Sequence, residues 1–293
     1  MAVEKAKETD AELVMASDPD ADRVGAAVKN NEGEWVLLNG NQTALMFVYY
    51  LITRWKELGK INGKEYIVKT IVTTETIKTI AERNGVEMYD VYTGFKWIAN
   101  VMRENEGKKN YIGGGEESYG FLCEDFVRDK DAVSACVILA EIAAWAKDQG
   151  LSLYQLLQKI YVEYGFSKEK GISVVKKGKS GAEEIEAMMK KFRENPLTEI
   201  AGSKVTYFYD YSTLKGKDYA ENETVTLDMP TTSNVLQYFT EDNTKVSIRP
   251  SGTEPKIKFY CEVHSKVKNI DELPEAEKAA EEKINQIKAS LGI

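Results

Sequence analysis

The alternation of apolar and polar residues is clearest between residues 245 and 263. Val246 and Ile248 alternate with polar residues before a short loop. A second alternating run follows the loop at Ile257, Phe259, Cys261 and Val263. A period of two predicts two half-buried strands, here joined as a hairpin. The opposite face of the hairpin is predicted to be polar, because it carries Lys245, Ser247, Arg249 and Lys258.

The loop of this hairpin has the composition of an anion-binding turn. It contains Arg249, Ser251, Gly252 and Thr253, which offer a guanidinium, two hydroxyl groups and backbone N–H groups. These donors suit one tetrahedral anion such as a phosphate. A plain polar turn is the alternative, and the outward-facing Lys258 favours the phosphate.

Between residues 39 and 171, strand-like and helix-like segments alternate. The predicted helices cover 42–58, 75–84, 97–104 and 132–148, and the predicted strands cover 67–72 and 86–92. This order predicts an α/β domain with a mainly parallel sheet. Ligands bind at the carboxyl ends of the strands in such sheets. The segments T-G-F-K (93–96) and G-G-G-E-E-S-Y-G (113–120) fall at those ends.

Residues 172–293 are predicted to form a second, α+β domain with an antiparallel sheet. The glycine- and lysine-rich segment 171–179 marks the boundary. Ser180 and Glu183 then open a helix with a capping box, as Ser152 and Gln155 do for an earlier helix. Alternating strands at 205–211 and 225–227, the hairpin and a helix at 274–291 complete the domain.

Residues 1–38 are predicted to form one helix and three short strands, which are too few to bury a core of their own. They either add to the sheet of the next domain or have their partners upstream of this sequence. The expected division is therefore 1–38, 39–171 and 172–293.

Three carboxylates alternate at Asp18, Asp20 and Asp22, directly after an apolar strand and before Arg23. Three acids at this spacing repel one another unless a cation lies among them. Oxygen ligands suit Mg²⁺ or a similar hard ion. A solvated acidic turn is the alternative.

The glycine-rich segment 113–120 is predicted to let the backbone approach a ligand closely or adopt positive φ. Glu116 and Ser118 offer groups that match sugar hydroxyls, and a flexible turn is the alternative. Lys96 lies in a strand-to-helix loop. Arg128 and Lys130 precede the helix that Asp131 is expected to cap, and they reach the ligand cleft or form a solvated charge run.

Composition narrows the function classes. The net charge of −8 argues against general nucleic-acid binding. Three cysteines without paired spacing indicate buried thiols in a reducing compartment. No signal peptide or membrane span is apparent, so a cytoplasmic location is expected. The chain has one histidine, so acid–base chemistry must come largely from Lys, Asp or Glu.

Four loops, D-P-D-A-D-R, T-G-F-K, G-E-E-S-Y-G and R-P-S-G-T-E-P-K-I-K, occur in this order. Together they resemble the α-D-phosphohexomutase family, most closely its phosphoglucomutase and phosphopentomutase-type bacterial members. The resemblance covers essentially the whole chain and corresponds to the carboxyl-terminal half of the family: the tail of domain two, then domains three and four.

The resemblance implies a role for each loop. Asp18, Asp20 and Asp22 match the Mg²⁺ ligands, and Arg23 matches the arginine beside the phosphoserine. Lys130 aligns with a basic residue proposed for proton transfer. The implied substrate-binding residues are Thr93, Gly94, Lys96, Glu116, Ser118, Arg249, Ser251, Gly252, Thr253 and Lys258.

The implied activity is a phosphosugar mutase that interconverts glucose 1-phosphate and glucose 6-phosphate through a phosphoserine and a bisphosphate. The family's phosphoserine motif, T-A-S-H-N-P-like, does not occur in this sequence. We therefore expect a fragment that lacks the upstream domains and is inactive alone. Phosphomannomutase or phosphopentomutase specificity, a non-enzymatic phosphosugar-binding module and a scaffold protein are the alternatives.

Overall fold

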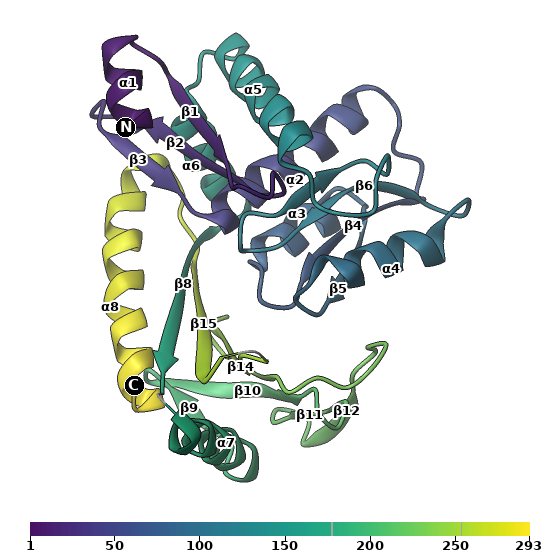
Figure 1. The fold of residues 1–293 in the computed structure, drawn as a ribbon, viewed down its shortest axis with the longest axis vertical. Helices are drawn as coiled ribbons and strands as arrows, with labels where there is room; N and C mark the ends of the chain where they lie inside the picture. Colours follow the sequence, from purple (N-terminus) through teal and green to yellow (C-terminus); the bar gives the residue numbers. More distant parts are fainter. Residues whose placement is uncertain (177, 253) are drawn as a thin grey trace. The chain divides into compact units, whose positions relative to one another are not determined.

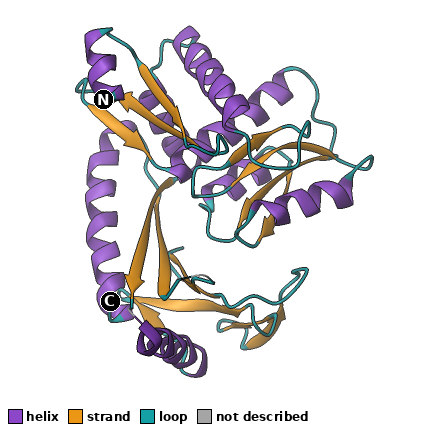
Figure 2. Cartoon of the chain, in the orientation of Figure 1, coloured by secondary structure: helices purple, strands orange, loops and turns teal. Residues whose placement is uncertain are grey.

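The computed structural model describes residues 1–176, 178–252 and 254–293. The chain divides into two compact units, Met1–Gly165 (unit 1) and Phe166–Ile293 (unit 2). Figures 1 and 2 show both units as mixtures of helices and strands. The expected fold class, an α/β domain followed by an antiparallel α+β domain, is confirmed.

Unit 1 begins with a small antiparallel sheet. Helix α1 (Ala2–Glu8) precedes β1 (Leu13–Ser17), β2 (Val24–Lys29) and β3 (Trp35–Leu38), which are ordered β1-β2-β3. The sheet does not join the larger sheet of unit 1, and it packs on α5 (Ala132–Asp148) and α6 (Leu153–Tyr164). The alternative in which these strands add to the sheet of the next domain is therefore wrong, because their cover in this unit comes from helices more than 90 residues later in the chain.

The second sheet of unit 1 has the order β5-β4-β6-β7. Strands β4 (Glu65–Thr70), β5 (Glu87–Val91) and β6 (Asn110–Gly115) are parallel, and β7 (Phe121–Cys123) is antiparallel to β6. The remaining helices of this unit are α2 (Gly40–Glu57), α3 (Thr76–Arg83) and α4 (Phe95–Asn105). The caps expected at Asp131 and Ser152 are both confirmed.

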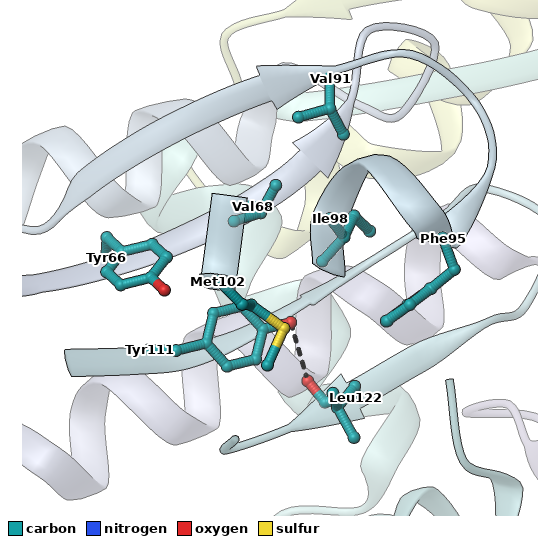
Figure 3. Close-up of a cluster of buried hydrophobic side chains, with 8 residues drawn as sticks. All are labelled: Tyr66, Val68, Val91, Phe95, Ile98, Met102, Tyr111 and Leu122. Atoms are coloured by element: carbon teal, nitrogen blue, oxygen red, sulfur yellow. Dashed lines mark hydrogen bonds between the residues drawn. The ribbon is translucent and has the colours of Figure 1, made fainter. Parts of the chain in front are cut away.

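A buried cluster fixes α4 on this sheet. Figure 3 shows Phe95, Ile98 and Met102 of α4 facing residues of β4, β5, β6 and β7. The hydroxyl of Tyr111 donates a hydrogen bond to the carbonyl of Leu122 at 3.4 Å. Since α4 starts directly after Gly94, this packing also fixes the position of the 93–96 loop.

Unit 2 is built on an antiparallel sheet with the order β12-β11-β10-β13-β14-β15-β8, and β9 pairs with β10. Its strands are β8 (Phe166–Val175), β9 (Glu199–Ile200), β10 (Ser203–Asp210), β11 (Lys215–Asp218), β12 (Glu223–Thr226), β13 (Leu236–Thr240), β14 (Lys245–Pro250) and β15 (Lys256–Ser265). Helix α8 (Leu273–Leu291), preceded by a 3₁₀ turn (Ile270–Glu272), packs on β15 and β8. Helix α7 (Gly178–Glu194) contacts β14 and β15.

The division between the units falls earlier than the sequence pattern placed it. Strand β8 pairs along its whole length with β15, from Phe166 opposite Ser265 to Val175 opposite Lys256. Residues 166–171 therefore belong to the sheet of unit 2, and the start of the expected linker, 171–175, is strand. The partner strand lies about 90 residues away, so local composition carried no sign of it.

The predicted hairpin is β14 and β15, and its apolar face is buried as expected. The opposite face differs from the prediction at the end away from the loop, where Lys245 and Ser247 are buried. Lys245 forms an ion pair with Glu262 at 3.0 Å, and Ser247 accepts a hydrogen bond from Gln237 at 2.7 Å. The strands are thus covered on both faces at this end.

Candidate functional site

The three aspartates lie in the loop between β1 and β2. One carboxylate oxygen of Asp18 accepts the backbone N–H groups of Asp22 (3.1 Å) and Arg23 (3.2 Å), which closes the loop. Desolvation opposes ionisation of Asp18, but these two hydrogen bonds and the charge of Arg23 lower its pKa. Asp20 is exposed. The loop geometry therefore holds Asp18 ionised.

Two protein cations face these carboxylates. The Nε of Arg23 lies 3.3 Å from Asp18 Oδ2 and 3.3 Å from Asp22 Oδ1, and the Nζ of Lys130 lies 2.7 Å from Asp22 Oδ2. In the described ranges, no three His, Cys, Asp or Glu side chains converge as a metal site would require. The oxygen donors suit Mg²⁺ chemically, but their present arrangement is directed at Arg23 and Lys130.

Backbone hydrogen bonds join three loops into one site in unit 1. Arg23 and Gly120 form a β-bridge, and the N–H of Val24 donates to the carbonyl of Tyr119 at 3.2 Å. The N–H of Ala132 donates to the carbonyl of Ala21 at 3.1 Å. The aspartate loop, the 116–120 loop and the segment carrying Lys130 are therefore held side by side.

Glu116 is the buried carboxylate of this site, with 5% of its surface exposed. Its Oε1 accepts the backbone N–H of Gly94 at 2.7 Å, so the two loops that were expected to read a sugar are directly connected. Gly94 has φ of +118°, a conformation that favours glycine. Thr93 and Ser118 are half-buried beside these residues in the chain.

The run Gly113–Gly115 has a different purpose from the one predicted. The three glycines lie in β6, and none has positive φ. A Cβ at Gly114 would lie 2.3 Å from the carbonyl oxygen of Val68, and one at Gly115 would lie 2.5 Å from the ring of Phe121. These glycines therefore permit close packing within the sheet, and this packing positions the adjacent Glu116.

An open groove of about 840 Å³ runs beside this site. Gly94, Lys96, Arg103, Arg128 and Lys130 contribute to its lining. Lys96 is exposed, and its ammonium lies 5.0 Å from the centre of the Trp97 ring. The groove gives a polar ligand access to the 93–96 loop and to Lys130.

Lys130 is largely shielded, with 17% of its side chain exposed. Burial disfavours its charged form, but the hydrogen bond to Asp22 and the charges of Asp129, Asp22 and Glu116 raise its pKa. The side chain is therefore a protonated donor in this arrangement.

Unit 2 has its own cluster of candidate residues, at the loop end of the β14–β15 hairpin. Arg249 and Lys258 are half-buried and occupy directly opposite positions on the two strands. Like charges at such a pair are destabilising, so this pair favours an anion beside it. The neighbouring Glu254 is exposed and bonds to Lys256.

The loop beyond this pair begins at Ser251. Ser251 is half-buried, its N–H donates to the carbonyl of Lys256 at 2.8 Å, and Gly252 is exposed. Thr253 lies outside the described residues. Pro250, Ser251 and Lys256, with Ile185 and Met189 of α7, border a cavity of about 310 Å³.

Sequence reasoning missed two buried lysines near these sites. Lys69, at the end of β4, lies 2.6 Å from Asp90 and 2.9 Å from Glu75. The signal was its position inside the apolar run 67–72, where an exposed lysine is improbable. Lys245 was assigned to the polar face of the hairpin, and its burial was not predicted because its partner Glu262 is on the other strand.

Comparison with known proteins identifies the family of this chain. Residues 39–164 match "Phosphoglucomutase/phosphomannomutase, alpha/beta/alpha domain III", and residues 174–280 match the "C-terminal domain" of the same family. Phosphoglucomutase from Staphylococcus aureus (strain USA300) is 38% identical over 272 residues, which cover 93% of this chain and 48% of that protein. Phosphoglucomutase from Staphylococcus haemolyticus is 33% identical over 264 residues, covering 90% and 47%. The chain thus spans about half the length of the relatives it matches.

Solved structures share the fold. A phosphoglucomutase/phosphomannomutase family protein from Burkholderia thailandensis superposes with a TM-score of 0.60 at 18% identity, covering 99% of this chain and 49% of that one. Parafusin from Paramecium gives 0.58 at 18% identity, covering 88% and 41%. Among the described residues, no helix is both long and apolar enough to cross a lipid bilayer. The chain belongs to the phosphoglucomutase/phosphomannomutase family and carries its domains III and IV.

Proposed function

We propose that this chain supplies the sugar, phosphate and metal loops of a phosphoglucomutase that interconverts glucose 1-phosphate and glucose 6-phosphate. Family membership supports the mutase class, and the relatives named phosphoglucomutase support glucose as the sugar. The observation that carries the phosphate assignment is the pair of facing cations, Arg249 and Lys258. Such a pair is stabilised when a dianion lies between the two side chains.

In this proposal, unit 2 holds the phosphate that is not transferred. Arg249 binds two of its oxygens through the guanidinium fork, while Lys258, Ser251, Gly252 and Thr253 complete the donor set. In unit 1, Glu116 and Ser118 form hydrogen bonds with two adjacent sugar hydroxyls. The other wall of the sugar site is formed by Thr93, Gly94 and Lys96. The buried Glu116 is held in place for this task by the Gly94 N–H.

The reacting end of the sugar would lie near Lys130 and Arg23. Arg23 neutralises charge on the phosphoryl group, and Lys130 gives a proton to, or takes one from, the sugar hydroxyl. Asp18, Asp20 and Asp22 are the residues that would hold Mg²⁺, which when bound neutralises phosphoryl charge. Phosphoryl transfer is mainly a matter of positioning and charge, and these residues provide both.

The phosphoserine motif does not occur in the 293 residues, so we propose that they bind phosphosugar without turning it over. Calorimetric titration with glucose 1-phosphate and with mannose 1-phosphate tests this. Arg249→Ala should weaken binding of glucose 1-phosphate by about 10- to 150-fold, because it removes a charge-assisted hydrogen bond worth about 1.5–3 kcal/mol.

Lys266→Ala is the matched control, because it removes one exposed positive charge at the far end of β15. Equal losses in the two variants would contradict a phosphate site at Arg249. Tighter binding of mannose 1-phosphate or of a pentose phosphate would assign those substrates in place of glucose. Turnover of glucose 1-phosphate by the chain alone would contradict the binding-only role.

A further inference from the structure

Lys130 occupies the position at Asp22 that a metal ion would need. Its Nζ lies 2.7 Å from Asp22 Oδ2, while the other oxygen of the same carboxylate lies 3.3 Å from Arg23 Nε. Both oxygens of Asp22 therefore already face protein cations. A Mg²⁺ ion requires oxygen ligands at about 2.0–2.1 Å in an octahedral arrangement.

The fold prepares the path by which Lys130 reaches Asp22. The stem of the lysine passes over Gly120, where an added Cβ would lie 2.6 Å from Lys130 Cδ. The following residues are tied down, because Asp131 N–H donates to the carbonyl of Phe121 (3.1 Å) and Ala132 N–H to that of Ala21 (3.1 Å). The contact is thus a packed feature of three loops.

We propose that Lys130 is an internal counterion which a divalent metal displaces from Asp22, so that metal binding releases its ammonium group into the groove beside Gly94 and Lys96. This inference rests on the proposed metal site at Asp18, Asp20 and Asp22. The charges favour it, because a dication bound at Asp22 repels an ammonium about 3–4 Å away more strongly than a single positive charge does.

Arg23 behaves differently from Lys130 in this exchange. Its Nε divides its contact between Asp18 and Asp22 at 3.3 Å each, and 48% of its side chain is exposed. It turns to solvent at little cost. Lys130 is only 17% exposed and is packed on Gly120, so its release moves it along the groove that it already lines.

The exchange gives an order to events at the site. Before the metal binds, the lysine neutralises Asp22 and is held away from a ligand in the groove. After the metal binds, the same ammonium is available to a phosphosugar near Glu116, whose charge also acts on Lys130. Metal occupancy and delivery of the lysine are therefore one step.

The test is the affinity of the full chain for Mg²⁺ in the absence of sugar, measured by calorimetry at constant ionic strength. Lys130→Met should bind Mg²⁺ about three- to tenfold more tightly than the unmodified chain, because its competitor for Asp22 is gone. Arg128→Met is the matched control. It removes the same charge from the same groove, but Arg128 pairs with Glu106 (3.3 Å), so its affinity should change less than about twofold.

A second variant separates displacement from charge. Gly120→Ala changes no charge, its φ lies outside the positive range, and its methyl group pushes Lys130 away from Asp22. It should also tighten Mg²⁺ binding. Circular dichroism and tryptophan fluorescence verify folding of each variant.

A direct readout comes from ¹³C-dimethylated lysines. The Lys130 resonance, identified by its absence in Lys130→Met, should shift when Mg²⁺ is added, and in Asp22→Asn it should already lie near the released position without metal. Equal affinities in Lys130→Met and Arg128→Met, with an unmoved resonance, would overturn the exchange and leave the metal assignment standing. Mg²⁺ binding in neither the unmodified chain nor any variant would overturn both.

Discussion

Two cross-strand positions of the β14–β15 hairpin carry charge in opposite ways. At the end of the hairpin farthest from the loop, Lys245 faces Glu262, and both side chains are almost fully buried, at 2% and 3% exposure. Four residues further along β14, on the same face, Arg249 faces Lys258, and both are half-buried. The Lys245–Glu262 pair has no net charge, whereas the Arg249–Lys258 pair carries two positive charges.

The difference separates stability from binding on one strand face. A buried opposite pair costs desolvation and is tolerated only when both partners stay, so it fixes the register of the two strands. A like-charged pair near the loop weakens the hairpin slightly and is relieved by an external anion. The hairpin thus holds its register at the end away from the loop and keeps its net positive charge beside the loop, where a ligand can bind.

The largest expected effect comes from breaking the Lys245–Glu262 pair. Lys245→Met removes the ammonium that faces the buried Glu262, whose carboxylate still contacts His264 at 2.7 Å. The local free energy of unfolding should fall by about 3 kcal/mol, the lower end of the range for a broken buried pair, because His264 still bonds the carboxylate. Hydrogen exchange of the peptides that cover residues 236–265 measures this loss.

Lys204→Met is the matched control for that measurement, because Lys204 is exposed on β10 of the same sheet. It should change protection by less than about 0.5 kcal/mol. The double variant Lys245→Met/Glu262→Gln should recover more than half of the loss, since no uncompensated carboxylate remains buried. If Lys245→Met were as stable as Lys204→Met, the Lys245–Glu262 pair would not stabilise the sheet.

The second prediction reverses the Arg249–Lys258 pair. Lys258→Glu converts two like charges into an opposite pair with Arg249, so the hairpin should gain about 0.2–1 kcal/mol in the same exchange experiment. The same change should weaken binding of glucose 1-phosphate at least about tenfold, because the new carboxylate repels the phosphate and occupies Arg249.

Lys258→Gln separates the two contributions, since it removes the positive charge without adding a negative one. It should lie between the unmodified chain and Lys258→Glu in both stability and affinity. If Lys258→Glu bound the sugar phosphate with unchanged affinity, Lys258 would not be part of the phosphate site. The like charges of Arg249 and Lys258 would then be no evidence for that site.

The smallest expected effect concerns pH. Burial disfavours protonation of His264, but the charge and hydrogen bond of Glu262 and the charge of Glu169 outweigh it and the opposing charge of Lys245, so its pKa is raised above 6.5. Because the folded pKa is the higher one, this group stabilises unit 2 fully below about pH 6.5. The contribution disappears as pH rises through the folded value.

His264 is the chain's one histidine, so a single imidazole resonance in proton NMR gives its pKa directly. The midpoint of urea unfolding, followed by circular dichroism, should fall as pH rises from about 6.5 to 8.5. His264→Gln should flatten this dependence. An imidazole pKa at or below 6.5 would contradict the described contact with Glu262.

Local patterns predicted the elements whose signals lie within a few residues. The caps at Asp131 and Ser152 and the alternation of Val246 and Ile248 needed no distant partner to be recognised. The four loops were also identifiable, because their polar residues cluster directly after strands. The joint placement of the first three loops in unit 1, through contacts such as Gly94 N–H to Glu116, was not predicted from spacing.

The failures share one physical cause, which is pairing over long sequence distance. Residues 166–171 were read as the end of the first domain, although they pair with β15. Lys245 was placed on an exposed face, because its covering neighbours come from other strands. The glycines of β6 were assigned to a ligand, although Val68 and Phe121 occupy the space that their side chains would need.

The pairing of β8 with β15 also sets when each unit can fold. Unit 1 closes its contacts within its first 165 residues, whereas β8, the first strand of unit 2, must wait for residues 256–265. During synthesis, unit 1 is therefore free to fold early, while β8 remains an unpaired edge for about 80 further residues. The charged run 168–170 in β8 places charged side chains along that waiting strand, and charged edges disfavour pairing with other exposed strands.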